Sequence, residues 1–352
     1  MPFRLSPPQI CATCVYGHCI SYIREQSKKM KDRDTQYRLS QAKITACAFD
    51  SWIPGGAGCP SIGQPFSYYL EQVEANAKLA GNTLETQPLG FFGKTEKRFF
   101  LTDAQLAKVR GDVFEMICRA ILWNRCAENN RALKNRGASS LPFPIAAVTL
   151  GDNYDLRKLF IPSVVKQLQA FLDALRERAI SLSYSTPDII GVNIETLGAD
   201  VIAHFSADIP NLSIQNQERL TQGRQLLEGK IRPEHVVFAC GIKTSIRSDR
   251  MYQFLFEANA WKYIWRRVFR VPVCRYHSVM TQTFGADPEK LRSLDFSADD
   301  GPVLAERAID SITTVLEPEG VSAWFDSVAR ELRGEALAVS RVVKPARIVK
   351  PT

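Results

Sequence analysis

Four short apolar segments, separated by longer segments of helical periodicity, constrain the fold of this chain most. The apolar segments cover residues 144–150, 189–194, 236–242 and 273–279, and these lengths are typical of strands buried in a sheet. Strands that alternate with helices are the pattern of an α/β domain, in which helices cover a central sheet. We therefore expect one elaborated α/β domain.

Helical periodicity predicts the elements around these strands. The expected helices cover residues 65–81, 102 to beyond 124, 162–179, 249–269, 303–316 and 321–332, and a small hairpin is expected within 89–101. Pro162 opens the clearest of these helices, because proline is favoured in the first turn. In the helix that begins near Thr102, Glu115 projects away from the apolar stripe through Val113 and Ile117.

Charge is concentrated in three segments of the chain. The net charge is +8, yet residues 1–44, 229–275 and 331–352 carry +5, +7 and +3, so the remainder carries −7. Solvated surface faces explain a single basic run. Three such runs on a chain with an acidic remainder favour a polyanionic partner such as nucleic acid.

Several classes of protein are excluded by what the sequence lacks. No run approaches 18 uncharged apolar residues, and the amino-terminal residues have no apolar core of a signal peptide, so we expect a cytoplasmic protein without a membrane partner. We then expect the nine cysteines to be free thiols; for one cluster, Cys11, Cys14, His18 and Cys19, the alternative is a zinc site. The four histidines form no zinc-protease motif, and neither GxxxxGK[ST] nor GxSxG occurs. Carboxylates and lysine must supply any catalysis.

Asp188 and Lys243 are the first candidates for that chemistry. Asp188 precedes one apolar strand, and Lys243 follows another 55 residues later, so neighbouring strands would place both at one sheet edge. A carboxylate there is suited to Mg²⁺, and a lysine stabilises charge on a phosphate. Glu257, in the next helix, and Glu115 are further candidates. Taken singly, each of these residues has an ordinary structural explanation.

The segment 247–250, Arg-Ser-Asp-Arg, adds a pattern suited to base recognition. Arginine donates two hydrogen bonds to guanine O6 and N7, and aspartate accepts one from cytosine N4. Arg247, Asp249 and Arg250 therefore match two adjacent G·C pairs. The alternative is an Arg–Asp ion pair at a helix start, where Asp249 is favoured by the helix dipole.

These residues, together with several longer segments, resemble the CCGG-cutting type II restriction endonucleases of the PD-(D/E)XK superfamily. The matching segments occur in family order between about residue 19 and about residue 332, and they are Arg33-Asp-Thr-Gln-Tyr with the later Ile53-Pro-Gly, residues 108–115, Trp123-Asn, Ser185-Thr-Pro-Asp188, and residues 243–259. The last segment is the most specific.

The resemblance implies a role for each matching residue. Asp188, Glu257 and Glu115 take the places of the acidic metal-site residues, and Lys243 that of the catalytic lysine. The wider superfamily has Asp or Glu two residues before this lysine, where this chain has Gly241, whereas the CCGG group supplies the carboxylate from the next helix. The residues implied to contact DNA are Arg247, Ser248, Asp249 and Arg250 in the CCGG core, and Arg33 and Lys108 beyond it.

The resemblance also implies a fold and an activity. The fold is a central mixed β-sheet flanked by helices, in one nuclease domain over residues 1–333, with a helical amino-terminal part to about 85, a catalytic core from about 86 to 333, and a basic tail at 334–352. The implied enzyme is a prokaryotic homodimer that cleaves double-stranded DNA at a palindrome with a CCGG core. It uses Mg²⁺, for which Mn²⁺ substitutes, and leaves 5′-phosphates on four-base 5′ overhangs.

The sequence leaves open the assembly state and two alternative functions. Relatives differ in whether dimers pair into tetramers or higher assemblies, and a cognate DNA methyltransferase is the expected functional companion. A PD-(D/E)XK nuclease of DNA repair would keep Asp188 and Lys243 without needing the 247–250 segment. A non-catalytic DNA-binding regulator would need only the basic segments.

Overall fold

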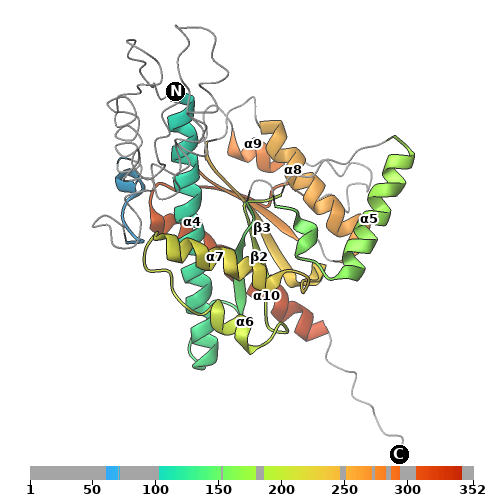
Figure 1. Cartoon of the computed structure of the whole chain (residues 1–352), viewed down its shortest axis with the longest axis horizontal. Coiled ribbons are helices and arrows are strands. Elements are labelled where there is room, and N and C mark those ends of the chain that lie inside the picture. Colours follow the sequence, from blue (N-terminus) through green and yellow to red (C-terminus); the bar gives the residue numbers. More distant parts are fainter. Residues whose placement is uncertain are drawn as a thin grey trace, which may run out of the picture. The chain divides into compact units, whose positions relative to one another are not determined.

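The computed structural model in Figure 1 describes residues 61–69, 71, 103–151, 154–179, 186–245, 251–271, 274–282, 287–293 and 307–342. Two compact units divide the chain: one holds residues up to Ile117 and Pro210–Gln217, and the other holds Cys118–Ile209 and the residues from Glu218 onward. The predicted hairpin within 89–101 and most of the predicted helix at 65–81 lie outside the described residues.

The described helices and strands follow one another as the alternating pattern predicts. In chain order they are α4 (Asp103–Lys134), β1 (Ile145–Thr149), η3 (Leu156–Lys158), α5 (Pro162–Glu177), β2 (Ile189–Asn193), α6 (Ala199–His204), α7 (Ile214–Leu227), η4 (Pro233–His235), β3 (Val236–Ser245), α8 (Met251–Tyr263), the π-helical turn η6 (Ile264–Phe269), β4 (Arg275–Gln282), α9 (Pro288–Ser293), β5 (Ser311–Thr314) and α10 (Pro318–Val342).

The second unit is built on a five-stranded mixed sheet. The strand order is β1-β2-β3-β4-β5, with β2 antiparallel to both neighbours and β3, β4 and β5 parallel. Parallel neighbours need crossover connections, and α8 with η6 supplies the one between β3 and β4. The predicted mixed sheet flanked by helices is therefore confirmed.

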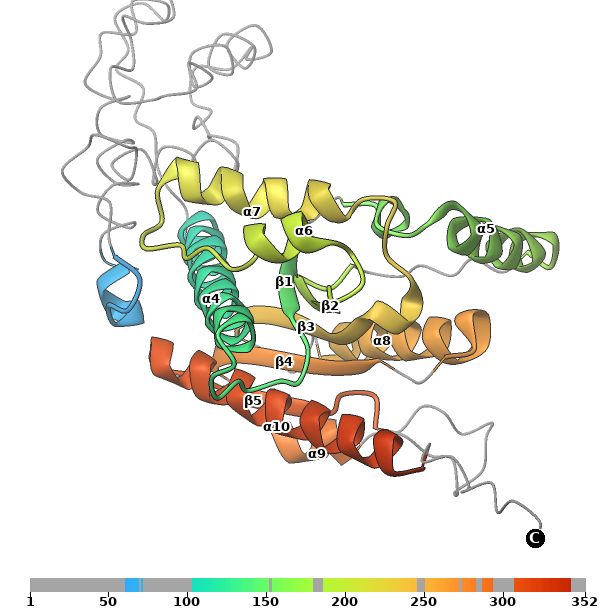
Figure 2. The ribbon, with the colours of Figure 1, turned by 90° about the horizontal axis from the view of Figure 1, so that it is seen from below.

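Different helices cover the two faces of this sheet. On one face the Phe238 ring of β3 packs edge-to-face against Trp324 and Phe325 of α10. Figure 2 shows α10 running alongside β4 and β5. On the other face, the Phe254 ring of α8 lies 3.3 Å from the position that a Cβ of Gly241 would take. Because side chains alternate along β3, Gly241 and Lys243 share the face that α8 covers.

Gly191 in β2 is required by the packing of the Phe238 ring. A Cβ at this position would lie 2.1 Å from that ring, which is fully buried against α10. We expect Gly191→Ala to lower the free energy of unfolding by about 2 kcal/mol, as overpacking of a dense core does. Denaturant unfolding measures the change, and Gly151→Ala, where a Cβ meets nothing within 4 Å, is the control. Equal stability of the two variants would contradict this account.

The carboxyl-terminal part of the chain differs from the sequence prediction. The predicted helix at 303–316 is wrong over Ser311–Thr314, which form β5. Three β-branched residues stand in this segment, and they pair in parallel with β4, so tertiary pairing outweighs the helical spacing of the apolar residues. The helix predicted at 321–332 is confirmed within α10, which continues ten residues further into the predicted tail. Helices α6, α7 and α9 were not predicted.

Candidate active site

Asp188 and Lys243 meet at one edge of the sheet. Asp188 directly precedes β2, whose Ile189 pairs with Cys240 of antiparallel β3, so Asp188 stands one step further along, opposite Gly241. The Oδ2 atom of Asp188 accepts a hydrogen bond from the backbone N–H of Ile242 at 2.6 Å and from the Nζ atom of Lys243 at 3.0 Å. The predicted juxtaposition of these two residues is present.

The two partners of this ion pair differ in exposure. The Asp188 side chain is 10% exposed, whereas the Lys243 side chain is 44% exposed. The backbone N–H of Ile242 offsets part of the cost of burying the carboxylate. The ion pair thus combines a buried, fixed carboxylate with an ammonium group that is accessible to a ligand from solvent.

Glu257 lies on the same face of the sheet. It is 9% exposed and lies one turn beyond Phe254 on α8, and the Phe254 ring touches the space beside Gly241. The Tyr276 hydroxyl of β4 is 3.1 Å from the same Cβ position. Burial raises the pKa of Tyr276 well above its ordinary value, and the negative charges of Glu257 and Asp188 raise it further. The two carboxylates therefore lie near one buried hydroxyl.

Two buried thiols lie close enough to Asp188 for its charge to affect them. Burial raises the pKa of Cys240 well above its ordinary value, and the negative charge of Asp188 adds to this effect. Burial likewise raises the pKa of Cys118, as do Cys240 and Asp188. Both thiols remain protonated at neutral pH, so the carboxylates and the lysine are the charged groups of this edge.

Glu115 belongs to α4 in the first unit and is 9% exposed. The sequence predicts that Glu115 projects away from the stripe through Val113 and Ile117, and its side chain is nevertheless buried. Its neighbours Val113, Phe114 and Met116 point in different directions around the helix and are all buried. At this level α4 is covered on every side, so periodicity does not identify a solvent face.

Most of the predicted DNA-contacting residues lie outside the described residues. Arg33, Arg247, Ser248, Asp249 and Arg250 belong to this group. Lys108 lies within α4, although its side chain is not among those described. The predicted helix at 249–269 corresponds to α8 with η6, so the 247–250 segment directly precedes the helix that carries Glu257.

The carboxylates of this edge fit a hard divalent cation in their chemistry. Among the described residues, no group of three or more His, Cys, Asp or Glu side chains is arranged to hold a metal ion. Mg²⁺, however, is commonly bound by one or two carboxylates together with water and substrate phosphates. Asp188 and Glu257 supply two such carboxylates, and the charges of both raise the pKa of the same Tyr276 hydroxyl.

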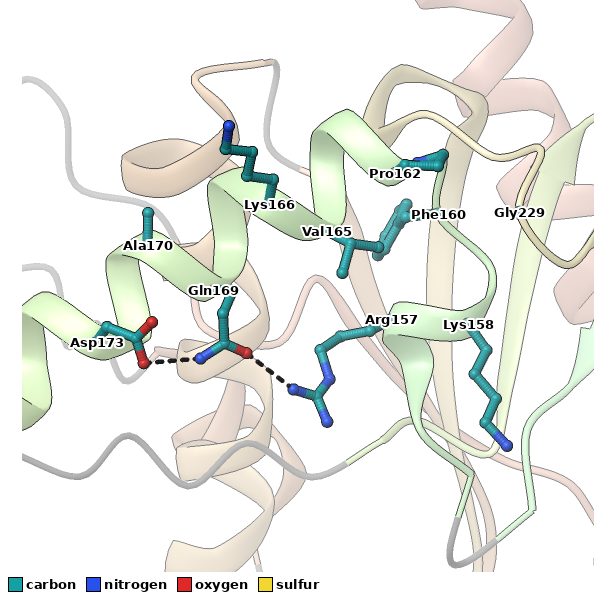
Figure 3. Close-up of a pocket in the computed structure, with 10 residues that line it drawn as sticks. All are labelled: Arg157, Lys158, Phe160, Pro162, Val165, Lys166, Gln169, Ala170, Asp173 and Gly229. Atoms are coloured by element: carbon teal, nitrogen blue, oxygen red, sulfur yellow. Dashed lines mark hydrogen bonds between the residues drawn. The ribbon is translucent and has the colours of Figure 1, made fainter.

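A separate cavity of about 820 Å³ lies between η3 and α5, and its lining includes none of the predicted site residues. Figure 3 shows the hydrogen bonds along its wall, from Arg157 to Gln169 at 3.1 Å and from Gln169 to Asp173 at 2.8 Å. Arg157 is also paired with Asp155 at 2.8 Å. Arg157, Gln169 and Asp173 of this wall thus already bind one another. Separately, no described helix is long and apolar enough to span a membrane.

Sequence reasoning missed Tyr276 and Phe254 as neighbours of the site. Both stand in predicted elements, yet nothing in their spacing from Asp188 or Lys243 marks them. The available signal was Gly241, two residues before Lys243, because a glycine in a buried strand often marks the close approach of other groups. The groups that approach here are the Tyr276 hydroxyl and the Phe254 ring.

Comparisons with known proteins agree with this fold. The model of the Cfr10I/Bse634I restriction endonuclease family matches residues 94–330. The solved structure titled "Bse634I restriction endonuclease" has a TM-score of 0.61 at 19% identity, over 77% of this chain and 88% of that one. The structure of type IIF Bse634I with cognate DNA has a TM-score of 0.65 at 18% identity, over 85% and 96%. No curated protein sequence matches the chain significantly.

Proposed function

Because this chain belongs to the Cfr10I/Bse634I restriction endonuclease family, whose members are site-specific deoxyribonucleases, we propose that it cuts double-stranded DNA at the sheet edge that holds Asp188 and Lys243. The observation that carries this proposal is the Asp188–Lys243 pair, a fixed carboxylate with an exposed ammonium group. The solved relative with cognate DNA supports duplex DNA as the substrate.

We propose a palindromic target with a CCGG core. The support is the 247–250 segment, in which Arg247, Asp249 and Arg250 provide the donors and acceptor for two adjacent G·C pairs. A likeness to SgrAI within the CCGG-cutting group is part of this proposal. Arg33 and Lys108 are proposed to contact DNA outside the core, and cleavage is proposed to leave four-base 5′ overhangs.

The proposed reaction is hydrolysis of one phosphodiester bond in each strand. A water oxygen attacks phosphorus in line with the leaving 3′ oxygen, so that the products are a 5′-phosphate and a 3′-hydroxyl. The exposed Lys243 ammonium stabilises the charge that develops on the phosphate and orients the water. Asp188 holds this ammonium at 3.0 Å and thereby fixes its direction.

The proposed cofactor is Mg²⁺, for which Mn²⁺ substitutes. Asp188 and Glu257 would hold the ion, and the family resemblance adds Glu115 as a third acidic residue. When bound, the ion supplies Lewis-acid polarisation of the scissile phosphate and of the attacking water. Carboxylate oxygens are the donors that Mg²⁺ prefers.

The proposed assembly is a homodimer in the cytoplasm of a prokaryotic cell, with a cognate DNA methyltransferase as companion. A palindrome presents two identical halves, which a two-fold symmetric dimer matches. Exposed aromatic side chains on one face of α8, namely Tyr252, Phe256 and Tyr263, offer area for such a contact. Sedimentation of the purified chain measures the assembly, including any tetramer.

Digestion of a long natural DNA with Mg²⁺ tests the proposed function. We expect discrete fragments, and sequencing of their ends should give CCGG-centred sites with four-base overhangs. A smear, or cutting at forks, would instead indicate a repair nuclease. A gel shift without cleavage in Mg²⁺ or Mn²⁺ would indicate a DNA-binding regulator.

A further inference from the structure

Tyr276 is a buried hydroxyl group beside the candidate metal ligands. It lies in β4, pairs in register with Ala239 of β3, and is 1% exposed. Its hydroxyl oxygen lies 3.1 Å from the Cβ position of Gly241, which is two residues before Lys243. Within the described part of the chain, this hydroxyl makes no hydrogen bond of standard length and angle. Buried polar atoms of this kind ordinarily have a partner.

Glu257 is the candidate for that partner, because it is buried and stands one helical turn beyond Phe254, whose ring reaches the same Gly241 Cβ position as the Tyr276 hydroxyl. Burial raises the pKa of Tyr276, and the negative charge of Glu257 raises it further, as expected where a carboxylate lies close to the hydroxyl. A tyrosine hydroxyl is a hydrogen-bond donor, and a carboxylate oxygen is an acceptor. Hydrogen bonds in an active site are often long or poorly aligned before ligands bind, and they tighten in the complex.

Gly241 explains why the hydroxyl reaches this position. Any larger residue at 241 would bring a Cβ to within 3.1 Å of the hydroxyl and 3.3 Å of the Phe254 ring. Both contacts are tighter than ordinary packing, and both neighbours are buried, so they have little room to move. The glycine thus leaves space for a donor from β4 to face a carboxylate from α8.

We propose that Tyr276 is a positioning residue: its hydroxyl donates to the Glu257 carboxylate and fixes the orientation in which Glu257 binds the divalent ion. The inference rests on the proposed function, because it takes Glu257 as a metal ligand. Groups that orient metal ligands typically contribute 10-fold to 100-fold to metal affinity. In this role Tyr276 would contact neither the metal ion nor the DNA.

The test is Mn²⁺ binding to the purified full-length chain, measured by electron paramagnetic resonance of the free ion. We expect Tyr276→Phe to weaken Mn²⁺ binding about 10-fold or more. The Mg²⁺ concentration for half-maximal cleavage should rise by a similar factor, with most activity restored at saturating Mg²⁺. Tyr154→Phe is the matched control, since the Tyr154 hydroxyl donates at 3.0 Å to Glu228, a carboxylate outside the candidate ligand set. This control should bind Mn²⁺ like the wild type.

One further variant, Glu257→Gln, separates the inference from the proposed function. Glu257→Gln should weaken Mn²⁺ binding directly. If Glu257→Gln weakens binding and Tyr276→Phe does not, the inference is overturned while the proposed function stands. If neither variant alters binding, Glu257 is not a metal ligand and both fail together.

Gly241→Ala covers the case in which Tyr276→Phe does not fold. This variant removes no functional group, but the added methyl lies 3.1 Å from the Tyr276 hydroxyl and is expected to push it away from its native position. We expect weaker Mn²⁺ binding in the same direction as for Tyr276→Phe. Wild-type Mn²⁺ affinity in a folded Gly241→Ala variant would overturn the positioning role.

Discussion

Replacement of Lys243 by alanine should lower the rate of DNA cleavage by about 10³-fold or more and leave DNA binding largely intact. The side chain is 44% exposed, and its ammonium group is fixed by Asp188 at 3.0 Å, so it is placed to act on a bound phosphate. Binding is expected to persist because the 247–250 segment, not Lys243, is proposed to read the bases. Single-turnover cleavage and gel-shift titration measure the two effects separately.

Lys166→Ala is the matched control for this experiment. Lys166 is an exposed lysine on α5 in the same unit, outside the candidate active site. The control should cleave like the wild type. Wild-type cleavage by the Lys243→Ala variant would show that the lysine has no part in the chemistry, whereas lost binding would move its role to DNA recognition.

The Asp188–Lys243 pair could be predicted from the sequence because its geometry is largely local. Each residue stands at the end of a short apolar run, and such runs are recognisable as buried strands. Once β2 and β3 are neighbours, the register that pairs Ile189 with Cys240 brings the two side chains together. The only non-local step is the adjacency of two strands.

The surroundings of Glu257 could not be predicted in this way. They depend on the parallel register of β3 and β4, which aligns Ala239 with Tyr276, and on how α8 packs over Gly241. None of these contacts produces a recognisable spacing of residues in the sequence. The mistaken helix at 303–316 has a similar origin, since pairing with β4 decides the structure of Ser311–Thr314.

Asp188, which the register of β2 and β3 places beside Lys243, is the second residue whose replacement should strongly lower cleavage. Asp188→Asn should lower cleavage by about 10³-fold or more, and it should also weaken Mn²⁺ binding, which Lys243→Ala should not. Asparagine has nearly the same shape as aspartate. Its carbonyl oxygen can still accept the hydrogen bond from the backbone N–H of Ile242, which is 2.6 Å long with the native Asp188. The fold is therefore expected to persist, while the charge that holds Lys243 and the cation is lost.

Comparing Asp188→Asn with Lys243→Ala separates cation binding from stabilisation of the phosphate charge. Asp326→Asn is the control for loss of an aspartate charge, because Asp326 pairs with Arg125 on the surface of the same unit. Such a pair contributes at most about 1 kcal/mol to stability, and its loss should leave cleavage and Mn²⁺ binding unchanged. If Asp188→Asn bound Mn²⁺ like the wild type yet failed to cleave, Asp188 would act only by holding Lys243. If it cleaved normally, the active site would lie elsewhere in the chain.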